Sequence, residues 1–168
     1  MPEKNKLLSK EIAKEKLHRL ALEIAEHLDE DATTLVLIGI KKNGMAIARS
    51  IRVFLQRYIP IPVDIREMTF DKKDLRLSHI TGDADFSDQH VVLIDDVSNS
   101  GRTLLYALKP LLEHMPKKIQ TLVMVERMHK LYPIHSDYVG LSIATTRHDY
   151  VSLEVEDGKV VGAFIENK

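Results

Sequence analysis

Cysteine is absent from the 168 residues of the sequence, and glycine and proline are scarce, with seven and six occurrences. Without cysteine, the protein has no disulfide, no thiolate nucleophile and no cysteine-ligated zinc or iron–sulfur site. An excess of charge is also lacking: 24 basic and 25 acidic side chains leave a net charge of -1, so no overall field attracts nucleic acid or anionic lipid. Because no run of about 18 apolar residues occurs, we expect a cytoplasmic protein without a membrane partner.

The length is that of one compact domain. Hydrophobic residues make up 44% of the chain and charged residues 29%, as is typical of a globular fold. The sequence contains no internal repeat, low-complexity tract or linker. We therefore expect a single domain over residues 1–168.

Apolar periodicity predicts strands that alternate with helices. Several β-branched and leucine runs are too short for helices and are separated by segments of helical spacing. Strands are expected at 34–40, 61–68, 91–97 and from residue 119, and an amphipathic helix over 7–28 with Ser9 as its N-cap. Because strands without polar alternation have both faces covered, the fold class is α/β: a mostly parallel twisted sheet flanked by helices.

Two regions depart from this alternation. Residues 67–88 carry mixed charge without a sustained period, and the connection is longer than compact domains usually have, so we expect a loop that is either disordered or a lid. In the C-terminal third, short strands over about 136–166 and the turn at Asp157-Gly158 predict a small cap region with a terminal hairpin.

The strongest chemical signal is the string VVLIDDVSNSGRT, residues 91–103. It places two carboxylates, Asp95 and Asp96, at the end of a parallel strand, which is where open α/β sheets bind ligands. The hydroxyl-rich loop 98–103 then opens a helix, whose free N–H groups and positive end suit a phosphate monoester. The carboxylates would repel that phosphate, so their ligands are sugar hydroxyls or a cation such as Mg²⁺. A sugar phosphate satisfies both halves, whereas a solvated strand end that only caps the helix is the alternative.

A second loop, GIKKNG, follows the strand at 34–40. Its spacing is similar to the start of a P-loop, but Met45-Ala46 stand where that motif needs Lys and Ser/Thr, which excludes nucleotide triphosphate hydrolysis. What remains is a backbone-rich turn with two lysines at a helix start, suited to a diphosphate. A plain turn with solvated lysines is the alternative.

Together these segments resemble the type I phosphoribosyltransferases, and within them the bacterial pyrimidine-operon attenuator proteins that also act as uracil phosphoribosyltransferases. The likeness covers nearly the whole chain. It is carried by the segments LVLIGIKKNG, TFDKKDL, VVLIDDVSNSGRT, LVMVERMHKLYPIHSDYVG and VVGAFIENK. The resemblance implies transfer of the phosphoribosyl group of phosphoribosyl diphosphate to a nucleobase, with uracil preferred and Mg²⁺ as cofactor. It also implies the type I phosphoribosyltransferase fold, a flexible hood loop over about 67–88 and a homodimer or homotetramer.

The resemblance further assigns residue roles. Asp95, Asp96 and Lys72 would be catalytic, and the two aspartates would hold the ribose diol and meet the metal indirectly, through water or substrate. The remaining positions would bind substrate: the diphosphate at Lys41, Lys42, Asn43 and Gly44, the 5-phosphate at Ser98, Asn99, Ser100, Gly101, Arg102 and Thr103, and the nucleobase at Glu126, Arg127, Tyr138 and Val139. For Tyr138, an ordinary packed strand aromatic is the alternative.

Departures from the family pattern bear on the activity. Asn99 stands where the 6-oxopurine enzymes carry an Asp and the pyrimidine regulators usually a Tyr, and an amide cannot act as a general base. Lys72 replaces the usual arginine of the hood and Lys73 an acidic residue, which predicts altered contacts to diphosphate and slow turnover. Asn99 thus weakens the case for a purine substrate, and a hypoxanthine or guanine phosphoribosyltransferase is the alternative enzyme. An RNA-binding attenuator or nucleotide sensor with little catalysis also stays open, although the near-neutral charge disfavours RNA.

The eight histidines show no HxH or HExxH spacing, so we expect solvated or helix-end roles rather than a metal site.

Overall fold

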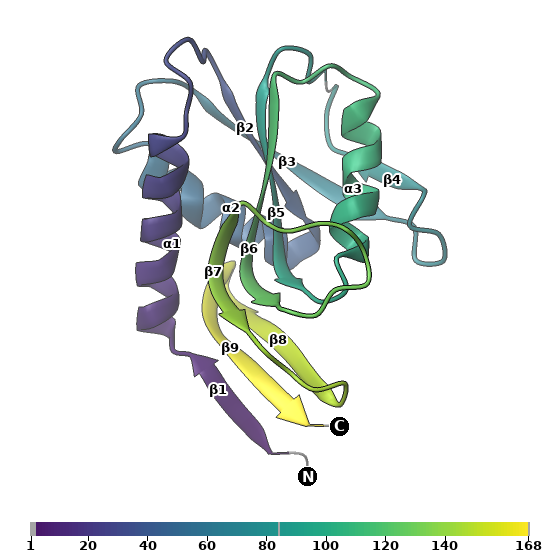
Figure 1. Ribbon diagram of the computed structural model, residues 1–168. Helices are drawn as coiled ribbons and strands as arrows, with labels where there is room; N and C mark the ends of the chain where they lie inside the picture. The colour runs from purple at the N-terminus through teal and green to yellow at the C-terminus, as the bar shows by residue number, and fades with distance from the viewer. Residues whose placement is uncertain (1–2, 84, 168) are drawn as a thin grey trace.

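The computed structural model describes residues 3–83 and 85–167 (Figure 1). Six strands form a central sheet in the order β4-β3-β2-β5-β6-β7, in which only β4 runs antiparallel to its neighbour. Their bounds are β2 Leu35–Ile40, β3 Val63–Phe70, β4 Ser78–Ile80, β5 His90–Ser98, β6 Lys118–Arg127 and β7 Tyr138–Ile143. The predicted mostly parallel sheet is confirmed.

Helices cover both faces of this sheet. The helices α1 (Lys10–Glu26) and α2 (Lys41–Leu55) pack on one face, and α3 (Arg102–Leu112) packs on the other (Figure 1). Strand β2 shows why its sequence is apolar throughout: Leu35 and Leu37 belong to the core under α1 and α2, whereas Val36 and Ile38 belong to the core under α3. Burial on both faces stabilises β2 at the centre of the sheet.

A second, antiparallel sheet joins the two ends of the chain. It has the order β1-β9-β8, with β1 at Lys4–Leu8, β8 at Asp149–Glu156 and β9 at Lys159–Asn167. The expected C-terminal hairpin is confirmed: Asp157 and Gly158 both have positive φ, 49° and 73°, as a two-residue hairpin turn requires. This sheet lies beside α1 and α2 (Figure 1).

The predicted helix over 7–28 is shorter than expected. It begins at Lys10, with the Ser9 hydroxyl accepting from the Ile12 N–H at 3.2 Å, and it ends at Glu26. Leu7 and Leu8 belong to β1 because this segment pairs with β9, a contact that helical periodicity does not reveal.

The segment 67–88 contains regular structure. Strand β3 continues to Phe70, and β4 pairs back on it with Met68 opposite Ile80. Among the described residues, no helix is long and apolar enough to cross a membrane.

Candidate active site

The junction between β2 and α2 is built on two glycines. A Cβ on Gly44 would lie 2.6 Å from the Ile94 carbonyl oxygen, and one on Gly39 would lie 2.7 Å from the Gly44 carbonyl carbon. Only glycine allows this approach, and Lys41 between them has a positive φ of 56°, which is unusual for a residue with a side chain. The close contact brings the first turn of α2 against the end of β5.

The junction between β5 and α3 is a tight loop. Gly101 precedes α3 with φ 83°, and the Ser100 hydroxyl accepts from the Arg102 N–H at 3.2 Å. The Ser100 carbonyl accepts the N–H groups of Leu131 and Tyr132 at 3.0 and 3.1 Å. These hydrogen bonds hold the loop in place. Its N–H groups stand at the N-terminus of α3, where helices bind anions.

These two junctions enclose a cavity of about 450 Å³. Its lining residues come from both loops: Ile40, Lys41, Lys42, Asn43, Asp95, Asp96, Val97, Asn99 and Thr103. A smaller hollow of about 50 Å³ adjoins it and is lined by Asp95, Val97 and every residue from Ser98 to Leu104. The structure thus brings together both predicted loops, with Gly44 serving the close packing of α2 rather than lining the cavity.

The two aspartates differ in environment. Asp95 is buried, and that burial, together with the neighbouring Asp96 charge, raises its pKa well above the usual value for an aspartate. Asp96 is half-buried; its Oδ1 accepts from the Val97 N–H and its Oδ2 from the Asn43 side-chain amide, both at 2.8 Å. Beyond them lies the Ser98 hydroxyl, a buried polar group without a hydrogen-bond partner among the described residues.

The side chains that could bind a metal ion decide what kind of cation fits in this cavity. No group of three or more His, Cys, Asp or Glu side chains in the described part of the chain is arranged to hold a metal ion. Two adjacent carboxylates, Asp95 and Asp96, do line the cavity. This set suits Mg²⁺, which is usually bound through one or two carboxylates with substrate oxygens and water as its other ligands.

Arg127 lies at the end of β6 and joins two loops. Its Nη1 donates to the Asn99 side-chain oxygen at 3.2 Å, its Nε to the Thr145 hydroxyl at 2.7 Å and its Nη2 to the Thr146 carbonyl at 2.8 Å. A further cavity of about 800 Å³ opens beside these contacts. It is lined by Asn99, Ser100, Arg127, His129, Lys130, Leu131, Thr145, Thr146 and Arg147.

Besides Gly44, four of the predicted site residues do not line these cavities. Glu126 is buried and pairs with the Lys130 ammonium, and its Oε1 also accepts from the Ser136 N–H at 3.1 Å. Val139 lies in β7, where its carbonyl accepts from Arg19 at 2.9 Å. Lys72 is exposed in the turn between β3 and β4 and lines none of the cavities described above.

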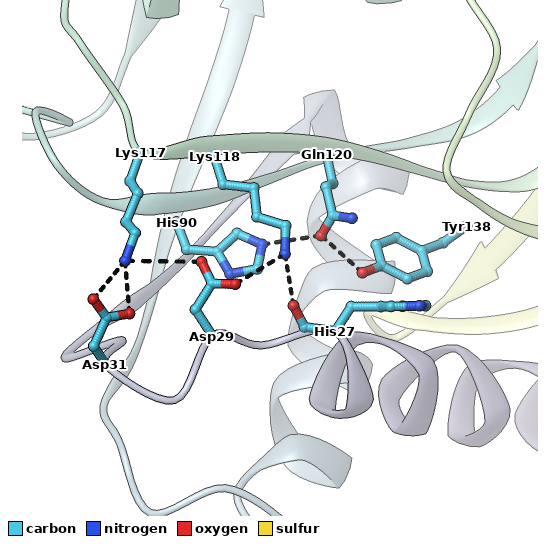
Figure 2. A network of polar contacts seen from close by, with 8 residues as sticks. All are labelled: His27, Asp29, Asp31, His90, Lys117, Lys118, Gln120 and Tyr138. Carbon is cyan, nitrogen blue, oxygen red and sulfur yellow. Dashed lines mark hydrogen bonds and ion pairs between the residues drawn. The ribbon is translucent and has the colours of Figure 1, made fainter.

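Tyr138 is the fourth, and the structure favours the alternative of a packed strand aromatic. It is the first residue of β7 and lies opposite Leu122, inside the core under α1 and α2. Its hydroxyl donates to Gln120 at 2.8 Å, and its ring lies beside His27 (Figure 2). Its position in β7 places it away from the carboxyl ends of the parallel strands, where the cavities open.

Thr145, Thr146 and Arg147 line the larger cavity but were not singled out from the sequence. They follow β7, so they lie at the same edge of the sheet as the loops after β5 and β6. A prediction that β7 runs parallel to β6 would have identified these three residues, because the loops that follow parallel strands carry ligand sites.

An α/β sheet with a carboxylate pair and a hydroxyl-glycine loop at one strand end has groups that suit a sugar phosphate, at the edge where open α/β sheets bind ligands. The chain belongs to the family described as phosphoribosyl transferase domain, whose model matches residues 5–157.

Two relatives of the chain carry the same name. It is 33% identical over 165 residues to "Bifunctional protein PyrR" of Clostridioides difficile, covering 92% of this chain and 93% of that protein. It is 34% identical over 161 residues to the protein of the same name from Staphylococcus carnosus, covering 90% and 91%.

Among solved structures, the chain resembles the hypoxanthine phosphoribosyltransferase of Trypanosoma cruzi in complex with IMP. The TM-score is 0.76 at 18% identity, over 99% of this chain and 92% of that one. A hypoxanthine-guanine phosphoribosyltransferase of Bacillus anthracis gives 0.68 at 23% identity, over 83% and 82%. At these identities the likeness concerns the fold, and it confirms the predicted architecture.

Proposed function

We propose that the protein transfers the 5-phosphoribosyl group of phosphoribosyl diphosphate to a nucleobase, with uracil as the preferred base. The observation that carries this proposal is the pair of adjoining cavities around Asp95, which combine two carboxylates, a lysine-bearing helix start and a hydroxyl-glycine loop. Each of these suits one part of the donor: the ribose hydroxyls, the diphosphate and the 5-phosphate.

The loop 98–103 is proposed to bind the 5-phosphate. Suitable donors for it are the N–H groups at the start of α3 and the Ser98 hydroxyl, which no other described residue engages. Lys41 and Lys42 at the start of α2 are proposed to hold the diphosphate, whose negative charge grows as it departs. Lys72 stays a proposed catalytic residue that would reach the donor through movement of the β3–β4 turn.

Asp95 and Asp96 are proposed to hold the ribose diol. When bound, Mg²⁺ would neutralise the diphosphate and would meet these carboxylates through water or substrate oxygens. Fixing phosphate, diol and diphosphate together aligns the donor, a gain of up to roughly 7–11 kcal/mol in favourable cases.

In the proposed reaction, a ring nitrogen of the base forms a bond to the anomeric carbon while the bond from that carbon to diphosphate breaks. The ring proton leaves to water or to diphosphate, because the Asn99 amide has no basic group to receive it. The larger cavity beside Arg127 is the proposed place of the base. Uracil is proposed because the chain resembles the pyrimidine regulators and lacks the Asp of the 6-oxopurine enzymes at position 99.

The test is incubation with phosphoribosyl diphosphate, Mg²⁺ and one base at a time, with diphosphate release measured. We expect release with uracil and little with hypoxanthine or guanine. Conversion of guanine but not uracil would reverse the choice of base. The double variant Asp95→Asn with Asp96→Asn is expected to lose donor binding, and calorimetry that shows no donor binding by the wild type would refute the proposal.

The RNA-binding regulator stays the second candidate, because the chain resembles the pyrimidine-operon attenuator proteins and two relatives are named as bifunctional. Filter binding on a pyrimidine-operon leader RNA, with and without uridine monophosphate, tests it. Binding that weakens steeply with salt would support it. A cytoplasmic location and a homodimeric or homotetrameric assembly also stay predictions.

A further inference from the structure

We infer that Asn43 is a positioning residue rather than a ligand of diphosphate: its side-chain amide orients Asp96 and joins the β1-β9-β8 sheet to the catalytic edge. The inference rests on the proposed function for the role of Asp96, but its geometric basis does not.

The hydrogen bonds of the Asn43 amide leave it nothing to donate to an anion. Its Nδ2 donates to Asp96 Oδ2 at 2.8 Å and to the Leu153 carbonyl at 3.2 Å. An asparagine amide nitrogen carries two hydrogens, so both are engaged, and the remaining side-chain atom, Oδ1, only accepts. A diphosphate offers acceptors only. The side chain of Asn43 therefore cannot serve the diphosphate without giving up one of these two bonds.

Asp96 gains a fixed orientation from this contact. The Val97 N–H donates to its Oδ1 at 2.8 Å while Asn43 donates to its Oδ2, so each carboxylate oxygen has a donor. A half-buried aspartate without the second contact would be freer to rotate, and that freedom would be lost when a ribose hydroxyl binds. Asn43 thus prepares the carboxylate for the sugar before the sugar arrives.

The second contact reaches a different part of the fold. Leu153 lies in β8 and is buried in the core under α1 and α2. Asn43 lies in the first turn of α2, which Gly44 allows to approach Ile94 of β5. One amide therefore connects α2, the end of β5 and the C-terminal sheet, and the docking of β8 is coupled to the orientation of Asp96.

A double-mutant cycle tests whether Asn43 acts through Asp96. We measure the affinity for phosphoribosyl diphosphate by calorimetry with Mg²⁺ present, in wild type, Asn43→Leu, Asp96→Ala and the double variant. A hydrogen bond to a charged group predicts that Asn43→Leu weakens binding about 10-fold or more. In the Asp96→Ala background the same change should cost about twofold or less, because the partner is already gone. Equal losses in both backgrounds would overturn the inference, since Asn43 would then contact the donor directly.

Ser50→Ala is the matched control within the same helix. The Ser50 hydroxyl donates to the Ala46 carbonyl, and Ser50 lies outside the cavities described above. Its removal should leave donor affinity unchanged. A loss as large as that of Asn43→Leu would show that any polar change in α2 weakens binding, and would contradict a specific role for Asn43.

A measurement without donor separates this inference from the proposed function. In ¹⁵N-labelled wild type, the two side-chain amide protons of Asn43 should exchange with water more slowly than those of an exposed asparagine. Asp96→Ala should accelerate exchange of one of them. If both exchange in wild type as freely as an exposed amide, the inference is wrong, whether or not the donor binds. If they are protected but wild type binds no donor, only the proposed function fails.

Discussion

Arg127 and Asn99 lie 3.2 Å apart, from guanidinium Nη1 to side-chain Oδ1, and this bond joins the loop after β5 to the end of β6. The same guanidinium holds Thr145 and Thr146 after β7. One side chain therefore holds the loops after β5 and β7 to the end of β6, at one edge of the sheet. Its planar fork is suited to bond in three directions at once.

Replacing Arg127 tests this role. Arg127→Met should reduce turnover with uracil by about 10-fold or more, because at least one charge-assisted hydrogen bond is lost. Donor affinity should change less, since Asp95, Asp96 and the 5-phosphate loop remain. Initial-rate kinetics and donor calorimetry separate the two effects.

Arg127→Lys is the control, because it keeps the charge but cannot make three directed bonds. We expect it to resemble Arg127→Met in turnover. Full activity of the lysine variant would show that charge alone matters at this position.

A buried ion pair holds the segment that follows β6. Side chains of Glu126 and Lys130 are only 11% and 6% exposed, and the Lys130 ammonium donates to the Glu126 carboxylate. Lys130→Met leaves that carboxylate buried without a cation, which should lower the free energy of unfolding by roughly 3–5 kcal/mol. Urea denaturation measures the loss.

Adding Glu126→Gln to Lys130→Met should restore much of the stability. The uncharged amide oxygen can still accept from the Ser136 N–H, as Glu126 does in wild type. A single variant within about 1 kcal/mol of wild type would mean that the pair is as weak as a surface salt bridge.

The sequence predicts well where local order carries the information. The apolar run of β5 with Asp95 and Asp96 at its end is contiguous in the chain, so both the strand and the carboxylate edge follow from local pattern. The loop at Lys41 and Lys42 also follows directly on an apolar strand. Because the carboxyl ends of parallel strands lie at one edge of the sheet, this loop could be placed beside Asp95 and Asp96.

Features that depend on distant segments could not be predicted. Tyr138 is predicted at the nucleobase, but its pairing opposite Leu122 decides that it is a core residue, and register is set by tertiary packing. The β1 strand exists because β9, at the other end of the chain, offers it an edge. Asn43 gains its contact with Leu153 only when β8 docks beside α2, which no local pattern shows.

The buried carboxylate of Asp95 should lower stability at neutral pH. Burial and the Asp96 charge raise the pKa of Asp95 above its unfolded value near 3.8, so ionisation is costlier in the folded state. The penalty is absent below the unfolded pKa and grows as pH rises toward the folded pKa. Asp95→Asn should therefore raise the melting temperature at pH 7 to 8, by roughly 2–4 °C per kcal/mol recovered, with the gain fading toward pH 4.

Thermal unfolding over this pH range checks the prediction, with Asp83→Asn as control because Asp83 is exposed. The control should shift the melting temperature little at any pH. An equal melting temperature of Asp95→Asn and wild type at pH 8 would show that the carboxylate is not destabilising. The same variant should bind the donor less tightly, so stability is gained where function is lost.

His90 lies at the opposite edge of the sheet, in the polar network of Figure 2. Its Nε2 is 3.0 Å from Gln120 Oε1, which also accepts from the Tyr138 hydroxyl. Because a carbonyl oxygen only accepts, the proton is on Nε2. His90 Nδ1 is then an unprotonated buried nitrogen without a hydrogen-bond partner among the described residues.

Burial lowers the pKa of His90 below 6.5; nearby Lys118 and Lys117 act in the same direction, against the Gln120 hydrogen bond and the Asp29 charge. The unfolded chain therefore binds the proton first as pH falls, and the folded state loses stability from about pH 6.5 down through the folded pKa. His90→Phe removes this titration. As pH falls from 8 to 5, the unfolding free energy of wild type should therefore decrease relative to that of His90→Phe.

Tyr138→Phe is the matched control, because it removes the other hydrogen bond to Gln120 without removing a group that titrates in this range. Burial raises the pKa of Tyr138 to about 12, so its hydroxyl stays neutral from pH 5 to 8. Its stability difference from wild type should therefore be the same across that range. Urea denaturation at each pH measures both variants. If the His90→Phe difference is equally constant, the buried imidazole does not titrate differently in the folded and unfolded states, and the prediction is wrong.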